Sequence, residues 1–180
     1  MSQQQTRGLD PAVVVVTGPV GAGKSTTVGA MAGLLNARGR RVWAVDQDYL
    51  RSVYPAADDD PYGARLGIEN LAACWVNVRR REVSAVLIAD VMEEPGQAQT
   101  YADALGLSRV LVARLDVRPE ELDRRLRARE APEHLEWHLE RAVVLQEQMQ
   151  RTGVGDVVVE VGSLSPAEVA AEVCRRTGLL

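Results

Sequence analysis

The chain contains 180 residues, of which 46% are hydrophobic and 26% are charged, a balance typical of one globular domain with a sizeable core. Its formal net charge of −4 argues against broad nucleic-acid binding, and no stretch is apolar for long enough to cross a membrane. The polar segment 1–10 lacks the apolar region of a signal peptide. We therefore expect a cytoplasmic protein with a flexible segment at 1–10 and a single domain at 11–180.

Apolar runs alternate with helical patterns along the chain. The run at 12–17 is continuous and β-branched, which indicates a strand buried on both faces. Four further strands are expected at 42–46, 85–90, 109–115 and 156–161. Because strands alternate with helices, the order predicts an α/β fold, a three-layer α/β/α sandwich around a five-stranded parallel sheet. Ligands of such sheets bind beyond the carboxyl ends of the strands.

The helices have clearer ends than the strands. They are expected at 24–38, 64–81, 97–105, 119–129 and 133–151. A last helix should start at Ser165-Pro166-Ala167-Glu168, which combines a capping box with proline in the first turn. A loop marked by Pro55, three successive aspartates and Pro61 is expected between residues 46 and 64.

The segment between the first strand and the first helix carries the strongest motif. Residues 18–25 fit the pattern G-x-x-x-x-G-K-[ST] in full, in the strand–loop–helix context that this pattern requires. Glycines let the loop curl so that its N–H groups converge on phosphate oxygens, and the start of the helix adds the positive end of its dipole. Lys24 is the only lysine among 21 basic residues. ATP with Mg²⁺ is therefore expected on Gly18, Pro19, Val20, Gly21, Ala22, Gly23, Lys24, Ser25 and Thr26.

Within this motif the chemistry of two side chains is specific. The lysine of the pattern reaches the β and γ phosphates, and the serine hydroxyl binds Mg²⁺. The guanine-binding pattern Asn-Lys-x-Asp is excluded because the single lysine follows Gly23. The pattern leaves open whether ATP or another nucleoside triphosphate is the donor.

The second strand ends in Asp46-Gln47-Asp48-Tyr49-Leu50-Arg51. This run resembles the Asp-Gly-Asp-x-x-Arg segment of adenylylsulfate kinases, and its Asp-x-x-Arg part is similar to polynucleotide 5′-kinases. In size and arrangement the chain also resembles chloramphenicol phosphotransferases. The resemblance implies a P-loop kinase type of fold. It implies that Asp48 faces the acceptor hydroxyl as a base or orienting group, and that Arg51 contacts the acceptor or the transferring phosphate.

The sequence departs from the adenylylsulfate kinase pattern at two positions. Gln47 replaces the glycine between the two aspartates. Glu69-Asn70 resembles the Glu-Asn pair of the substrate helix in that family, but the arginine that precedes the pair there would fall at Gly67. Under this resemblance Arg65 would take the place of that arginine, and these departures favour a different acceptor.

Carboxylates at the ends of two strands are the candidate metal partners beside Ser25. Asp90 ends the apolar run of the third strand, the position of a Walker-B carboxylate. Asp46 would support the Mg²⁺ shell through water, and the sequence does not decide between Asp46 and Asp90. Glu93 and Glu94 follow in the same loop as weaker candidates.

The helix at 119–129 carries arginines that resemble those in the lid helix of nucleoside monophosphate kinases. Arg125 and Arg129 are four residues apart and share a face. The resemblance implies that they clamp the nucleotide, although Glu121 is equally placed to pair with Arg125. It also implies that Gly162 and Ser163, after the fifth strand, lie near the adenine.

Together these features predict an ATP- and Mg²⁺-dependent phosphotransferase that moves the γ-phosphate to a hydroxyl of a small molecule, a metabolite or an antibiotic. The catalytic residues would be Lys24, Asp48, Arg51, Arg125 and Arg129. The alternative is a non-catalytic or regulatory ATP-binding protein. We expect a small-molecule acceptor as the partner, no nucleic acid or membrane, and a monomer or homodimer.

Overall fold

The computed structural model describes residues 10–180, so the segment 1–9, which was expected to be flexible, lies outside the described residues. Five parallel strands form one sheet in the order β2-β3-β1-β4-β5. They are β1 (Ala12–Thr17), β2 (Val42–Asp46), β3 (Ala85–Ala89), β4 (Leu111–Asp116) and β5 (Val157–Glu160).

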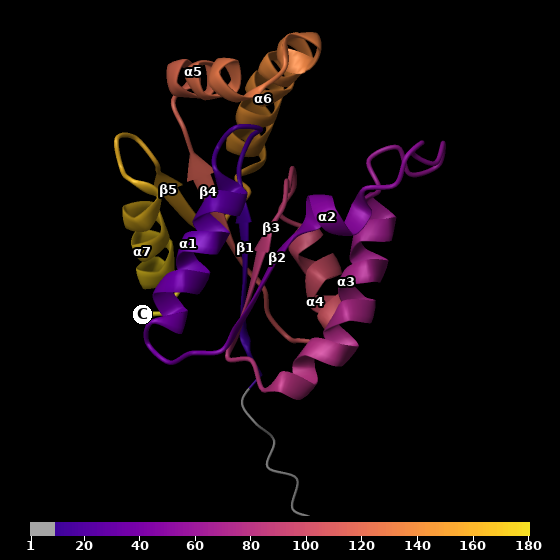
Figure 1. Cartoon of the computed structure of the whole chain (residues 1–180), viewed down its shortest axis with the longest axis vertical. Coiled ribbons are helices and arrows are strands. Elements are labelled where there is room, and N and C mark those ends of the chain that lie inside the picture. Colours follow the sequence, from indigo (N-terminus) through magenta and orange to yellow (C-terminus); the bar gives the residue numbers. More distant parts are fainter. Residues whose placement is uncertain (1–9) are drawn as a thin grey trace, which may run out of the picture.

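Helices cover both faces of this sheet (Figure 1). They are α1 (Lys24–Asn36), α2 (Gln47–Arg51), α3 (Ala64–Val78), α4 (Gln97–Leu105), α5 (Pro119–Arg129), α6 (Pro132–Thr152) and α7 (Pro166–Arg176). Helices α1 and α7 pack together on one face, and α3 packs with α4 on the other, while α5 and α6 stand beyond one end of the strands (Figure 1). The expected three-layer α/β/α sandwich with a five-stranded parallel sheet is confirmed.

Strand β1 lies at the centre of both cores. Val14 and Val16 belong to the core beneath α1 and α7, whereas Val13 and Val15 belong to the core beneath α3 and α4. Side chains of a strand alternate between its faces, so a strand covered on both sides needs apolar residues at every position. The continuous apolar run at 12–17 therefore indicates a strand that is buried on both faces.

Most element ends agree with expectation to within one or two residues. The capping box at the start of α7 is present, with the Ser165 hydroxyl accepting from the Glu168 N–H at 3.3 Å and the Glu168 carboxylate accepting from the Ser165 N–H at 2.8 Å. Helix α3 ends earlier than expected, and the chain continues through Arg79–Arg81 as a single 3₁₀ turn. Tightened last turns of this kind are common at helix ends.

The prediction of a loop directly after β2 is wrong. Residues Gln47–Arg51 form the short helix α2, because the carboxylate of Asp46 accepts the N–H of Asp48 at 3.0 Å and caps its first turn. The Asn70 side chain of α3 donates to the Leu50 carbonyl at 2.6 Å and ties the two helices together. Helix α2 places Asp48 and Arg51 three residues apart on one face.

The carboxyl ends of β1, β2 and β3 meet at one edge of the sheet. Asp46 pairs in register with Ala89, which in turn pairs with Val16. The N–H of Asp90 donates to the Val16 carbonyl at 3.2 Å, one residue before the chain leaves β1. The carboxylates that end β2 and β3 therefore lie beside the segment that follows β1.

Gly63 gives a test of how α2 and α3 fit together. It precedes α3 with φ 61°, and a Cβ atom there would lie 2.6 Å from the carbonyl oxygen of Arg51. We expect Gly63→Ala to lower the free energy of unfolding by about 2 kcal/mol or more, since left-handed backbone is strained for alanine and the α2 carbonyl must move. Urea denaturation measures the change.

Gly33→Ala is the matched control for that substitution. Gly33 lies within α1, and nothing lies within 4 Å of a Cβ built on it. Alanine there should stabilise the protein by about 0.5–1 kcal/mol through its helix propensity. Equal stabilities of the two variants would contradict the packing described.

Candidate active site

The loop between β1 and α1 has the backbone of a phosphate cradle. Gly18 has φ 152°, and a Cβ there would lie 2.9 Å from the carbonyl oxygen of Leu115. Gly23 is the N-cap of α1 in the left-handed region, makes no side-chain cap, and is followed by no acidic residue in the first turn. The first N–H groups of α1 and the positive end of its dipole are therefore left for an anion.

Lys24 is held against this loop by its own carbonyls. Its Nζ donates to the carbonyl oxygens of Gly18 at 3.0 Å and Pro19 at 3.1 Å. Burial lowers the pKa of Lys24 to about 8, although Asp48, Asp90 and Asp46 act in the opposite direction. A bound polyphosphate would supply the anion that this ammonium lacks.

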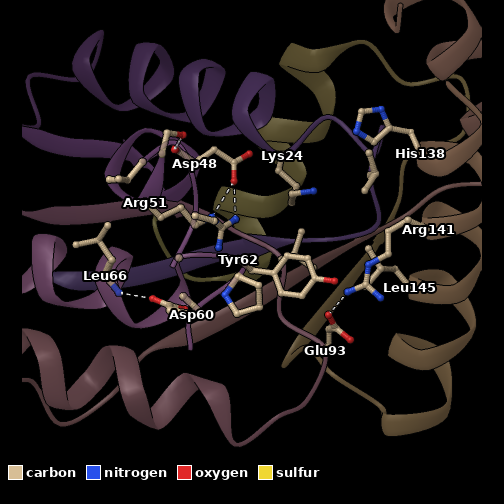
Figure 2. Close-up of a pocket in the computed structure, with 18 of the residues that line it drawn as sticks. Lys24, Asp48, Arg51, Asp60, Tyr62, Leu66, Glu93, His138, Arg141 and Leu145 are labelled. Carbon is tan, nitrogen blue, oxygen red and sulfur yellow. Dashed lines mark hydrogen bonds and ion pairs between the residues drawn. The ribbon is translucent and has the colours of Figure 1, made fainter. Parts of the chain in front are cut away.

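A cavity of about 1150 Å³ opens beside the loop. One wall is the phosphate loop with α2 and the segment 51–66, and the facing wall is α6 with the segment after β3 (Figure 2). Lys24 lies between the two walls, with Asp48 and Arg51 on one side and His138 and Arg141 on the other (Figure 2). Predicted site residues that line it are Val20, Gly21, Gly23, Lys24, Ser25, Thr26, Asp48, Arg51 and Arg129. Those that do not are Gly18, Pro19, Ala22, Asp46, Asp90, Arg125, Gly162 and Ser163.

Asp48 and Arg51 contact one another at the wall of this cavity. Arg51 donates from Nε at 3.1 Å and from Nη2 at 2.5 Å, and both bonds go to Oδ1 of Asp48. The Asp48 side chain is 74% exposed and lines the cavity, and its second oxygen accepts no hydrogen bond from Arg51. The same Nη2 lies 2.9 Å from Oδ1 of Asp90, which is buried.

The three predicted metal partners are placed differently. Ser25 is exposed at the start of α1 and lines the cavity, whereas the Asp46 carboxylate caps α2. Asp90 contacts Arg51 and accepts a hydrogen bond from Tyr101, and burial raises the pKa of its carboxyl despite Arg51.

Residues 10–180 contain no group of three or more His, Cys, Asp or Glu side chains arranged to hold a metal. The exposed Ser25 hydroxyl at the cavity fits Mg²⁺, which is commonly held by one or two protein oxygens together with substrate phosphates and water. Ser25 is placed to be such a ligand. The supporting roles of Asp46 and Asp90 stay predictions.

The two lid arginines have different surroundings. Arg125 donates from Nε to Glu121 at 2.7 Å, the pairing that was the alternative to a lid role. Its Nη1 also donates to the Ala22 carbonyl of the phosphate loop at 3.3 Å. Arg129 lines the cavity, and its Nε donates to Glu130 at 2.7 Å. Their part in binding nucleotide stays a prediction.

The loop after β5 does not border this cavity. Gly162 and Ser163 lie between β5 and α7, and Gly162 has φ 47°. Their predicted place near the adenine is untested and stays a prediction.

The buried side chain of Gln47 occupies the space that a side chain at position 67 would need. Gln47 is 1% exposed, and a Cβ built on Gly67 would lie 2.8 Å from its Oε1 and 3.3 Å from the Cβ of Arg51. A side chain at position 67 would therefore displace Gln47 or Arg51. The two departures from the adenylylsulfate kinase pattern are one packing solution, in which a larger residue in α2 requires a glycine in α3.

Several residues at the site gave little signal in the sequence. Arg141 of α6 pairs with Glu93, and both lie in the wall that faces α2 (Figure 2). The Nδ1 of His138 lies 3.0 Å from Oε2 of Glu130. Tyr101 of α4 donates its hydroxyl to Asp90. Arg141 follows His138 by three residues in a predicted helix, and that spacing places both side chains on one face. No sequence pattern indicated that Tyr101 would reach the site.

The pKa of Lys24 can be measured without ambiguity because the chain has no other lysine. In protein labelled with ¹³Cε-lysine, NMR should show one lysine signal that titrates at about pH 8, against an ordinary value of 10.5. Saturating ATP should move that midpoint upward, since phosphates stabilise the charged form.

The lowered pKa of Lys24 also makes the free energy of unfolding depend on pH. Since the unfolded chain keeps this proton up to its ordinary pKa of 10.5, Lys24 should add to the free energy of unfolding as the pH rises from about 8 to 10.5. A midpoint near 10.5 in the free protein would show that the ammonium is not held beneath the loop as described.

Comparisons with known proteins give the family and the fold type of the chain. The sequence model of the zeta toxin family matches residues 1–150. The tunicamycin resistance protein of Deinococcus radiodurans has a similar structure, with a TM-score of 0.63 and 18% identity over 95% of this chain and 98% of that one. A gluconokinase from Sinorhizobium meliloti aligns with a TM-score of 0.61 and 22% identity, over 94% of this chain and 93% of that one.

An APS kinase from Mycobacterium tuberculosis, solved with AMPPNP and APS, aligns with a TM-score of 0.59 and 20% identity over 92% of this chain and 98% of that one. These likenesses concern the fold, and they confirm the P-loop kinase type that the sequence resemblance implied. No curated protein sequence matches the chain. Since the family match extends over 150 of the 180 residues and includes the whole phosphate loop, the chain belongs to the zeta toxin family.

Proposed function

We propose that the chain transfers the γ-phosphate of ATP, with Mg²⁺, to a hydroxyl group of a small molecule. One observation carries this proposal: Lys24 and Ser25, which suit a polyphosphate, line the same cavity as Asp48 and Arg51, which suit an acceptor. Proteins with this fold include a gluconokinase, a shikimate kinase and an APS kinase, which supports the same class of reaction here.

The donor half of the reaction rests on the phosphate loop. The N–H groups at the start of α1 would bind phosphate oxygens, and Lys24 would exchange its bonds to the loop carbonyls for the β and γ phosphates. When bound, Mg²⁺ neutralises charge on those phosphates, with the Ser25 hydroxyl as its protein ligand. Arg129 lines the same space and would add positive charge as the phosphoryl group moves.

The acceptor half rests on α2. One oxygen of Asp48 accepts hydrogen bonds from Arg51, and the other would accept the proton of an acceptor hydroxyl and orient it. The contacts of Arg51 use Nε and Nη2, which leaves Nη1 for the acceptor or the transferring phosphate. Phosphoryl transfer needs little beyond such positioning and charge.

The cavity suits a small-molecule acceptor beside the nucleotide. Its volume of about 1150 Å³ exceeds the usual range for a pocket that holds one small ligand, roughly 300–1,000 Å³. Among residues 10–180, no helix is both long enough and apolar enough to pass through a bilayer. A cytoplasmic location, the monomeric or dimeric state and the absence of nucleic-acid partners belong to this proposal as expectations.

Asp48→Asn tests the proposed reaction. Products of Mg·ATP incubated with a panel of hydroxyl-bearing metabolites and antibiotics would be analysed by mass spectrometry, and ADP release would be timed with each compound. We expect an acceptor that stimulates ADP release, and we expect Asp48→Asn to reduce that stimulated rate by about 100-fold or more. The Kd of Mg·ATP should stay unchanged, because the phosphate loop is intact.

Asp58→Asn is the matched control, since Asp58 is an exposed aspartate of the adjoining loop that does not line the cavity. It should keep the stimulated rate. Tight ATP binding with no phosphorylated product across the panel would instead indicate a non-catalytic ATP sensor and overturn the proposal.

A further inference from the structure

We propose that Tyr101 and Asp90 are positioning residues that hold Arg51, and through it Asp48, in place for the acceptor. This inference rests on the proposed function for its kinetic consequence, but not for its structural content. It assigns Asp90 to the guanidinium of Arg51 rather than to the metal, and it gives Tyr101 a part in the site.

Tyr101 is fixed within the core. It lies on α4 with 3% of its surface exposed, in the apolar cluster that includes Leu71, Ile88 and Leu105. Its hydroxyl donates to Oδ2 of Asp90. A phenol packed in this way has little freedom to turn, so the core fixes the position of its hydroxyl oxygen beside Asp90.

Asp90 is fixed by its backbone as well as by that hydroxyl. It directly follows β3, its N–H donates to the Val16 carbonyl at 3.2 Å, and it is 9% exposed. The second oxygen, Oδ1, lies 2.9 Å from Nη2 of Arg51, an ion pair without the angles of a good hydrogen bond. Both oxygens of Asp90 therefore face protein donors, and neither lines the cavity.

Arg51 is held from two sides of very different exposure. The Asp90 carboxylate is 9% exposed and the Asp48 carboxylate is 74% exposed, while Arg51 itself is 19% exposed. Exposed ion pairs are weak and easily exchanged, whereas a buried carboxylate keeps its partner in a low-dielectric setting. The ion pair with Asp90 thus holds the Arg51 guanidinium in place. The ion pair with Asp48 is exposed, and a bound acceptor can rearrange it.

Three successive contacts lead from the core to the cavity. The Tyr101 hydroxyl donates to Asp90, Asp90 pairs with Arg51, and Arg51 donates to Asp48. Without the phenol hydroxyl, Asp90 loses the donor that sets its rotamer, and Arg51 gains freedom. Within residues 10–180, no hydrogen bond or ion pair joins the phosphate loop to these four residues. We therefore expect the binding of ATP not to depend on the Tyr101 hydroxyl.

Tyr101→Phe tests the inference because it removes only the hydroxyl and keeps the ring in the core. We expect kcat with the acceptor found by the panel to fall about tenfold, the effect of losing one hydrogen bond to a charged group, with the KM for ATP unchanged. In the double-mutant cycle with Asp90→Asn, the second substitution should add little, because both residues act through one contact.

Two readouts separate positioning from other roles. If Asp90 positions Arg51, Asp90→Asn should leave the Mg²⁺ concentration that gives half-maximal rate unchanged, whereas a metal role would raise it. In ¹⁵N-arginine protein, the Nε–H signal of Arg51, assigned by its loss in Arg51→Lys, should exchange with water about tenfold faster in Tyr101→Phe than in wild type.

Trp75→Phe is the control for a merely structural effect. Trp75 donates from its ring to the Leu105 carbonyl at 2.8 Å in the same apolar cluster, so its loss also removes a buried hydrogen bond. This variant should lose stability without changing kcat or the Arg51 signal. An unchanged Arg51 signal in Tyr101→Phe, or additive losses in the cycle, would overturn the inference. If wild type phosphorylates no acceptor, the proposed function fails while the NMR comparison still decides this point.

Discussion

The contact of Lys24 with the carbonyls of its own loop is the interaction on which the site depends. The ammonium of Lys24 donates to the carbonyls of Gly18 and Pro19, and the first turn of α1 beside it has no side-chain cap. Both features are unfavourable without an anion, because a helix start is left uncapped and a buried amine holds its proton weakly. Such an arrangement is explained by a ligand with several negative charges.

The acceptor side is built on a much smaller element. Helix α2 has five residues, and a helix of that length has no stability of its own. It persists because Asp46 caps it, Asn70 ties it to α3, and the glycines at the start of α3 let the two helices approach. The orientation of the candidate acceptor residues is therefore a property of tertiary packing and not of the local sequence.

Opposite α2, the cavity wall is formed by α6, which reaches over the carboxyl ends of the strands from the core. Leu145 is buried with the apolar cluster and also lines the cavity, while Arg141 one turn earlier pairs with Glu93. The Arg141–Glu93 pair of this wall faces Asp48 and Arg51 across the cavity (Figure 2). Their partners can change on binding, because these side chains remain partly exposed.

Much of the fold could be predicted from the sequence because the signals were local. A β-branched run with no polar position specifies a strand covered on both faces, and the phosphate loop has a fixed spacing between a strand and a helix. Helix α2 was missed because five residues are too few to show a helical period. Tyr101 was missed because its contact with Asp90 depends on how α4 packs against the sheet, which one sequence does not show.

The family could not be read from the motifs, since the phosphate loop and the Asp-x-x-Arg segment are shared among P-loop kinases of several kinds. The motifs did indicate which residues line the candidate site. Lys24 and Ser25 begin helix α1, Asp48 and Arg51 belong to helix α2, and all four residues line one cavity in the structure.

The most direct test of this account is the affinity of Mg·ATP for the Lys24→Ala protein, measured by calorimetry beside the unaltered chain. The account predicts a Kd at least about tenfold weaker, since the bonds from the ammonium to the phosphates are lost. An unchanged Kd, or an unaltered chain that binds no nucleotide at all, would contradict it.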